Sequence, residues 1–152
     1  MLSNHFSCRL VPKPDCWFRC FEGMNKEIYV AMQGASEFTF GGVLKGWNVT
    51  DDIKRHVKCP TLVIRGEYDT MTERCHQLIV DSIPAAHPLV TIPRAGHCKL
   101  IDEPQLCCDA IERFVACNEA AAEAAAAAVA RESAARREAE AVLPPAPPKR
   151  RK

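Results

Sequence analysis

The sequence lacks several features that would each assign it to a class of protein. Its uncharged stretches, such as Ala124 to Ala130, are shorter than the roughly 18 apolar residues of a membrane-spanning helix. Its formal net charge is only +1, so no overall charge draws the chain toward nucleic acid or an anionic membrane. Charged side chains interrupt its first 20 residues, unlike the apolar core of a signal peptide. We therefore expect a soluble protein of the cytoplasm.

The Cys-x-x-Cys motif is also absent, although the chain has nine cysteines. The closest spacing is that of Cys16 and Cys20, and neither His97-Cys98 nor Cys107-Cys108 has the spacing of zinc ligands. An odd number of cysteines without a secretory segment does not favour a disulfide framework. We therefore expect no metal site and no cofactor. Most of the thiols are expected to behave as small buried hydrophobic side chains.

Composition divides the chain into three regions. Residues 1–50 are rich in aromatic and turn-forming residues, and residues 51–117 have the regular pattern of strands and helices. Residues 118–152 are mostly alanine at first, then proline-rich, and end in Lys149-Arg150-Arg151-Lys152. Because alanine favours helix but offers little surface to pack, we predict an Ala-rich helical or disordered tail. Its basic end leaves a nuclear-import role open.

The middle region alternates between strand and helix patterns. We predict a short helix capped by Asp51, a strand over 61–64, a helix over 72–83, a strand over 89–92 and a helix over 103–117. The two strands, with the helix between them and the helix after them, form a right-handed βαβ unit followed by a helix. Since two parallel strands cannot be covered on both faces by so few elements, we expect them to belong to a larger parallel sheet.

Each predicted strand leads into a loop with one titratable side chain. Asp69 ends Gly66-Glu67-Tyr68-Asp69 after the first strand, and His97 follows Gly96 after the second. The carboxyl ends of parallel strands meet at one edge of a sheet, where Asp69 could accept a hydrogen bond from His97 and His97 could act as a general base. Their order is that of the acid and base in α/β-hydrolases. Taken alone, Asp69 is better interpreted as a surface residue that caps the next helix, but the pair of Asp69 and His97 favours the triad.

The nucleophile motif of those enzymes, Gly-x-Ser-x-Gly, is absent from the sequence. Ser36 lies in Gly34-Ala35-Ser36-Glu37-Phe38, which lacks the second glycine and does not follow a strand. A cysteine nucleophile at Cys98 or Cys75 is disfavoured. Cys98 neighbours His97, so the two side chains should diverge, and no pair of oxyanion donors is evident beside it.

Further motifs run through the chain in a fixed order. They are Asn25-x-Glu27-x-Tyr29, Met32-x-Gly34-x-x-Glu37-Phe38, Leu44-x-x-Trp47, Pro60-Thr61-Leu62, the Asp69 and His97 loops, and Glu103-Pro104. Together they resemble the proline iminopeptidases, α/β-hydrolase serine aminopeptidases that release N-terminal proline from small peptides. The resemblance covers residues 8–116. It implies an α/β fold: the C-terminal part of an α/β-hydrolase, with the late cap segment in 1–50 and the last βαβα of the parallel sheet in 51–117.

The resemblance also implies roles for particular residues. Asp69 and His97 take the positions of the triad acid and base, and Glu37 that of the cap glutamate that binds the α-amino group of the substrate. Thr70 stands where the family often has a second acid, and this departure would weaken recognition of the amine. The implied partner is a small peptide or amino-acid amide, with no cofactor, nucleic acid or membrane. The sequence does not indicate an oligomeric state.

Two functions follow. The chain is a fragment of a proline iminopeptidase-like serine hydrolase. Alone it is expected to be inactive because the nucleophile serine is absent, and only marginally stable because its strands expose edges meant for other strands. Alternatively, it is a non-catalytic α/β-hydrolase remnant that acts as a binding protein. A coding segment for Gly-x-Ser-x-Gly upstream of Met1 favours the first function, and a genuine start at Met1 favours the second.

Overall fold

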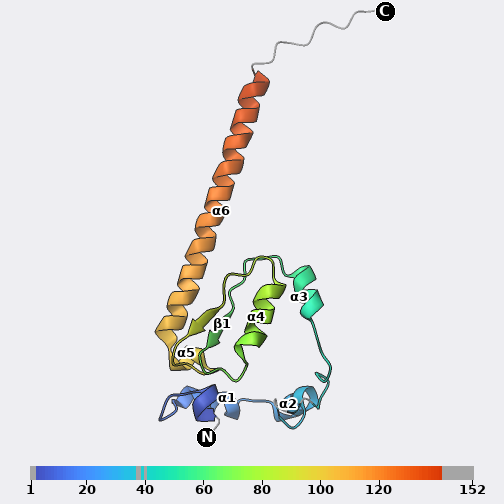
Figure 1. Cartoon of the computed structure of the whole chain (residues 1–152), viewed down its shortest axis with the longest axis vertical. Helices are drawn as coiled ribbons and strands as arrows, with labels where there is room; N and C mark the ends of the chain where they lie inside the picture. Colours follow the sequence, from blue (N-terminus) through green and yellow to red (C-terminus); the bar gives the residue numbers. More distant parts are fainter. Residues whose placement is uncertain (1–2, 37–38, 40, 142–152) are drawn as a thin grey trace, which may run out of the picture. The chain divides into compact units, whose positions relative to one another are not determined.

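The computed structural model describes residues 3–36, 39 and 41–141. The chain divides into two compact units, Met1–Ile111 and Glu112–Lys152 (Figure 1). Glu37, the proline-rich stretch from residue 144 and the basic run at 149–152 lie outside the described residues. No helix within the described ranges combines the length and apolar character needed to cross a membrane.

A parallel βαβ unit forms the centre of the first unit. Strands β1 (Ile64–Gly66) and β2 (Val90–Ile92) pair in parallel, and helix α4 (Glu73–Ser82) connects them. The prediction of two parallel strands joined by a helix is therefore confirmed. The predicted bounds of the first strand are wrong, because Thr61 forms only an isolated bridge with Ala86 and the ladder begins at Ile64.

Short helices precede this unit along the chain, and one follows it. They are η1 (Ser3–Ser7, a π-helical turn), α1 (Asp15–Glu22), α2 (Lys26–Gln33), α3 (Thr50–His56) and α5 (Lys99–Asp102). Helix α2 begins with a side-chain cap, since Asn25 accepts hydrogen bonds from the amides of Glu27 and Ile28. This cap belongs to one of the motifs on which the family resemblance depends.

The prediction that Asp51 caps helix α3 is wrong. The helix already begins at Thr50, before Asp51, and the side chain of Asn48 accepts hydrogen bonds from both the amide and the hydroxyl of Thr50. Asp51 and Asp52 instead lie in the first turn. Carboxylates in that turn favour the helix through its dipole rather than by capping an amide.

The last helix, α6 (Pro104–Ala141), begins against the sheet and continues through the alanine-rich sequence. Its first turns provide Cys107 to a small core with Ile92 and Ala95, against which Ile64, Val90 and Leu106 pack. Ile111 and Val115, further along the helix, are exposed. The predicted end of this helix at residue 117 is wrong, because α6 continues to Ala141 and alanine sustains helical structure without burial.

The prediction that most cysteines are buried is wrong. Cys8 and Cys107 are buried and Cys98 is half-buried, whereas the other six are exposed, and all nine are free thiols. Cys16 and Cys20 illustrate the reason, because they lie on α1, a helix without a buried residue. The surroundings of a cysteine, rather than its intrinsic hydrophobicity, decide its burial here.

Candidate active site

Asp69 and His97 meet at the carboxyl edge of the sheet. Asp69 lies in the loop after β1 and His97 in the loop after β2, with 2.8 Å between Oδ1 of Asp69 and Nδ1 of His97. The Asp69 side chain is fully buried and the His97 side chain is half exposed. Because an ionised carboxylate only accepts hydrogen bonds, Nδ1 donates, and the neutral ring keeps Nε2 as an acceptor. An imidazole oriented in this way can take a proton from a nucleophile.

The environment of Asp69 keeps its carboxylate ionised. Burial raises the pKa of Asp69, but the amide of Met71, the hydrogen bond and charge of His97 and the ammonium of Lys99 together bring that pKa below its ordinary value. Oδ1 accepts from the Met71 amide at 3.0 Å. Helix α4 has no side-chain cap at Thr72, so Asp69 is neither a surface residue nor the cap of that helix.

Two glycines allow close contacts between the backbone segments around the site. The amide of Tyr68 donates to the carbonyl of Ala95 at 2.9 Å. A Cβ on Gly66 would collide with the carbonyl oxygen of Gly96 and would lie 2.5 Å from that of Ala95. A Cβ on Gly96 would lie 2.7 Å from the carbonyl oxygen of Ser7. Side chains at either position would push the backbones apart, and Asp69 would lose contact with His97.

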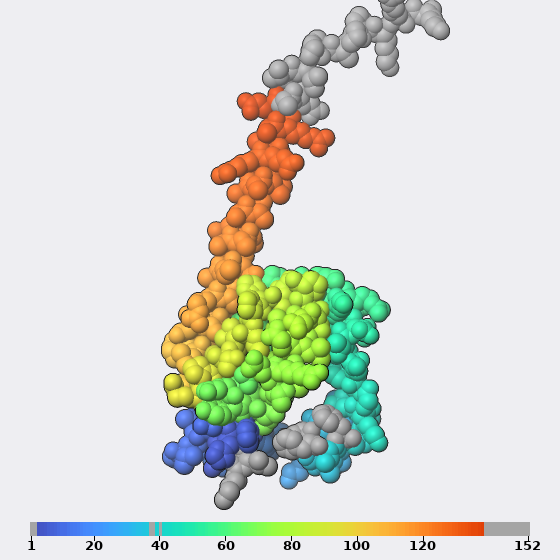
Figure 2. All heavy atoms as spheres, viewed as in Figure 1, coloured from blue at the N-terminus to red at the C-terminus, as the bar shows by residue number. Residues whose placement is uncertain are grey.

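Backbone hydrogen bonds join the N-terminal residues to the loop that contains His97. The amide of His97 donates to the carbonyl of Phe6 and the amide of Cys98 to that of Ser7, each at 2.7 Å. In Figure 2 these N-terminal residues, in blue, lie directly against the green and yellow residues of the sheet loops. The segment over 3–10 therefore forms part of the framework of the site.

The buried carboxylate of Asp102, on α5, joins the N-terminal segment to the loop that contains His97. Oδ2 accepts from the amide of Gly96 at 2.8 Å, and Oδ1 accepts from the amides of Arg9 at 2.7 Å and Leu10 at 3.3 Å. The guanidinium of Arg9 also lies 3.9 Å from the ring centroid of Tyr68. Asp102 thus orders the backbone immediately before His97.

Sequence reasoning missed two residues beside Asp69. His76 Nε2 and Lys99 Nζ each lie 3.8 Å from Asp69 Oδ2. The available signal was helical spacing: His76 precedes Ile79 and Ile83 by three and seven residues, so all three share one helix face. Leu78, on the same helix, is exposed, while His76 is buried.

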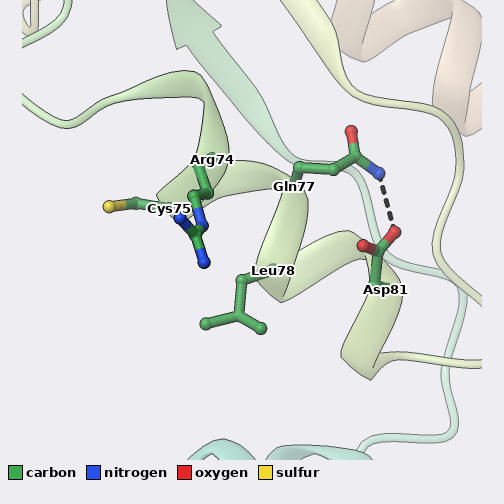
Figure 3. A pocket seen from close by; sticks show the side chains of 5 residues that line it. All are labelled: Arg74, Cys75, Gln77, Leu78 and Asp81. Atoms are coloured by element: carbon green, nitrogen blue, oxygen red, sulfur yellow. Dashed lines mark hydrogen bonds between the residues drawn. The ribbon is translucent and has the colours of Figure 1, made fainter.

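The outer face of α4 has a shallow hollow of about 320 Å³, lined by Arg74, Cys75, Gln77, Leu78 and Asp81. Figure 3 shows these side chains, with Gln77 donating to Asp81 at 2.8 Å. A second hollow, of about 310 Å³, has an apolar lining that includes Ile28, Met32 and Leu44 beside α2. Neither lining includes Asp69 or His97.

Other proposed chemistry finds little support in the described part of the chain. Burial raises the pKa of the Cys98 thiol, which lowers its thiolate fraction at neutral pH. Within residues 3–36, 39 and 41–141, no group of three His, Cys, Asp or Glu side chains is placed to hold a metal ion. Glu37, the predicted amine-binding residue, lies outside these ranges.

Taken together, the parallel βαβ unit and the residues that follow its strands have the fold of the C-terminal part of an α/β-hydrolase. A solved structure of a proline iminopeptidase from Mycobacterium smegmatis superposes with a TM-score of 0.72 and 31% identity, over 80% of this chain and 40% of that one. The resemblance to the proline iminopeptidases is thereby confirmed at the level of structure.

Sequence comparison leads to the same group. The chain is 32% identical over 108 residues to the proline iminopeptidase of Saccharolobus solfataricus, covering 70% of this chain and 34% of the relative. It is 30% identical over 108 residues to that of Flavobacterium johnsoniae, covering 71% and 36%. The chain thus spans about a third of the length of these curated relatives. No family model matches it.

Proposed function

We propose that this chain provides the acid and base of a serine hydrolase that releases N-terminal proline, or a similar residue, from small peptides or amides. The observation that carries the proposal is the 2.8 Å contact between buried, ionised Asp69 and half-exposed His97. The similarity to proline iminopeptidases supports the substrate class.

The geometry supports a definite division of labour. Asp69 accepts the hydrogen bond from Nδ1, fixes the tautomer of His97 and stabilises its imidazolium form. Nε2 takes the proton of a serine hydroxyl as the serine attacks the peptide carbonyl, and then returns it to the leaving amine. This mechanism needs a serine at a nucleophile elbow, which the 152 residues do not contain. We therefore propose that the nucleophile is supplied from outside them and that they are inactive by themselves.

Reconstitution tests the proposal. The 152-residue chain is joined to the segment of the Mycobacterium smegmatis relative that contains its nucleophile, and release of the arylamine from a prolyl arylamide is measured. We expect hydrolysis by the joined protein and none by the chain alone. In the joined protein, His97→Ala and Asp69→Asn should each lower kcat by about 10⁴-fold. His56→Ala, on the exposed face of α3, is the matched control and should retain activity.

The outcomes separate the parts of the proposal. Equal activity of His97→Ala and the unmodified joined protein would remove the triad assignment. Hydrolysis by the chain alone, lost on His97→Ala, would contradict its dependence on an external nucleophile. The intact mass of the native protein and its transcript upstream of Met1 give an independent test, since a product without a Gly-x-Ser-x-Gly segment would favour the non-catalytic binding protein.

Amine recognition is assigned to Glu37 on the resemblance. Glu37→Gln in the joined protein should raise KM for a prolyl arylamide and leave kcat nearly unchanged, because the charge-assisted hydrogen bond to the ammonium is weakened. Thr70→Glu restores the acid that relatives often have and should lower KM. An N-acylated substrate is the control, as it has no ammonium group. Equal effects on both substrates would contradict the assignment.

A further inference from the structure

A second acidic side chain crosses between the two loops that contain Asp69 and His97. Glu67 precedes Asp69 in the loop after β1, and its Oε2 accepts a hydrogen bond from the amide of Arg94 at 2.8 Å. Arg94 lies where the chain leaves β2 and turns toward His97. Asp69 therefore contacts the histidine itself, whereas Glu67 contacts the beginning of the loop that leads to it.

Arg94 has a backbone conformation that is unfavourable by itself. Its φ angle is 60°, in the left-handed region that residues other than glycine rarely adopt. Its guanidinium also forms an ion pair with Glu103 at 3.0 Å, but the Arg94 side chain is 69% exposed and flexible, so this contact does little to fix the backbone. The hydrogen bond to Glu67 acts on the backbone amide, and it therefore orients the peptide group next to the φ angle directly.

The backbone of Glu67 is itself fixed, so its side chain extends from a rigid position. Its amide donates to the carbonyl of Ile92 at 2.9 Å. Its carbonyl accepts from the guanidinium of Arg65 at 3.1 Å, and the Arg65 side chain is only 9% exposed. Hydrogen bonds to a carboxylate are stronger than those between neutral groups. Glu67 therefore joins the end of β1 to Arg94 by a contact that is both short and well anchored.

We propose that Glu67 is a positioning residue for His97: it holds Arg94 in the left-handed conformation that directs Nδ1 of the histidine at the triad acid. Without this acceptor, Arg94 would relax toward negative φ and redirect the chain that leads to His97. Nδ1 would then contact Asp69 for only part of the time. The effect of Glu67 on catalysis rests on the proposed function, whereas its effect on the contact between Asp69 and His97 does not.

The first test compares two side chains of similar length in the 152-residue chain. Glutamine retains an oxygen that can accept from the amide of Arg94, whereas methionine has no strong acceptor. Glu67→Met should speed hydrogen exchange of that amide at least about tenfold, and Glu67→Gln should change it less than about threefold. Glu112→Met, exposed on α6, is the matched control and should leave the exchange unchanged. Rapid exchange of the Arg94 amide in the unmodified chain would overturn the proposal without any substitution.

The second test follows His97 in the same proteins. Long-range ¹⁵N NMR of histidine-labelled protein shows which ring nitrogen carries the proton of the neutral imidazole. The unmodified chain and Glu67→Gln should show a protonated Nδ1, as the contact with Asp69 requires, whereas Glu67→Met should show a mixture of tautomers. This readout separates positioning from local stability, because a carboxylate that only stabilised the turn would alter amide exchange and leave the tautomer unchanged. The Glu67 side chain is exposed, and an amide spectrum establishes that each variant is folded.

Each pattern of results decides. An unchanged His97 tautomer in Glu67→Met would overturn the proposal, because the other hydrogen bonds of the loop would then suffice to position the ring. Loss of the protonated Nδ1 in Glu67→Gln as well would also overturn it, since a retained acceptor should preserve the contact.

Kinetics extends the test to catalysis. In the joined hydrolase, Glu67→Met should lower kcat about tenfold with KM nearly unchanged, and Glu67→Gln should restore most of that loss. Full kcat in an active joined Glu67→Met protein would overturn the role in catalysis. Failure of reconstitution would affect the proposed function alone, since amide exchange and the tautomer are measured in the unjoined chain.

Discussion

The amide of Gly96 donates to Oδ2 of Asp102 at 2.8 Å, so a buried carboxylate holds the residue directly before the candidate base. The other oxygen of Asp102 accepts from the amide of Arg9 at 2.7 Å, across 93 positions of sequence. One side chain therefore fixes the histidine loop and the N-terminal segment together. Its removal should loosen both at once.

Asp102→Asn tests this linkage. An asparagine side chain can accept on one side only, and its NH₂ group opposes a backbone donor on the other. We expect a local loss of about 1–3 kcal/mol, which corresponds to roughly 5- to 150-fold faster exchange of the Gly96 or Arg9 amide. Hydrogen exchange followed by NMR measures it. Asp81→Asn is the control, since Asp81 is exposed and accepts from Gln77. Equal exchange in both variants would show that Asp102 does not hold these segments.

Gly66→Ala probes the close approach of the loops that contain Asp69 and His97. The added methyl group would meet the carbonyl oxygens of Ala95 and Gly96, which are backbone atoms and cannot rotate away. We expect a loss of about 1–3 kcal/mol in unfolding free energy and a weakened contact between Asp69 and His97. Urea unfolding, followed through the amide signals of β1 and β2, checks the first expectation.

Gly23→Ala is the matched control for that substitution. Its methyl group would meet only the Arg19 carbonyl oxygen at 3.5 Å, an ordinary van der Waals contact. We expect its unfolding midpoint to stay close to that of the unmodified chain. Equal midpoints for Gly66→Ala and Gly23→Ala would contradict the tight approach of the loops.

The acid dependence of stability should reflect Asp69. Its pKa in the folded chain lies below the ordinary value of 3.8, so the ionised form is favoured by folding. This contribution is fully present above about pH 3.8 and is lost as the pH falls through the lower folded pKa. The difference in unfolding free energy between the unmodified chain and Asp69→Asn should therefore shrink in acid. Urea titrations at about pH 6 and about pH 3 measure it. A difference that grows in acid would contradict the direction of the shift.

The sequence was sufficient for the parts of the site that depend on local pattern. Asp69 and His97 each follow a short apolar strand, and parallel pairing brings strand ends together without further information. Asp102 and His76 could not be assigned in this way. Their contacts join Arg9 to α5 and α4 to the loop after β1, and such contacts depend on the packing of elements distant in sequence. The N-terminal support of the His97 loop was missed for the same reason.

Cysteine reactivity tests both the burial pattern and the choice of nucleophile. Burial raises the pKa of the Cys8, Cys98 and Cys107 thiols, so each has less thiolate at neutral pH than an exposed thiol. We expect iodoacetamide to modify the six exposed cysteines first, Cys98 more slowly, and Cys8 and Cys107 only after unfolding. Peptide mass spectrometry over time measures the order, with urea-unfolded protein as the control in which all nine react alike. If Cys98 instead reacted fastest in the folded chain, its thiol would be activated beside His97, and a cysteine rather than a serine would become the candidate nucleophile.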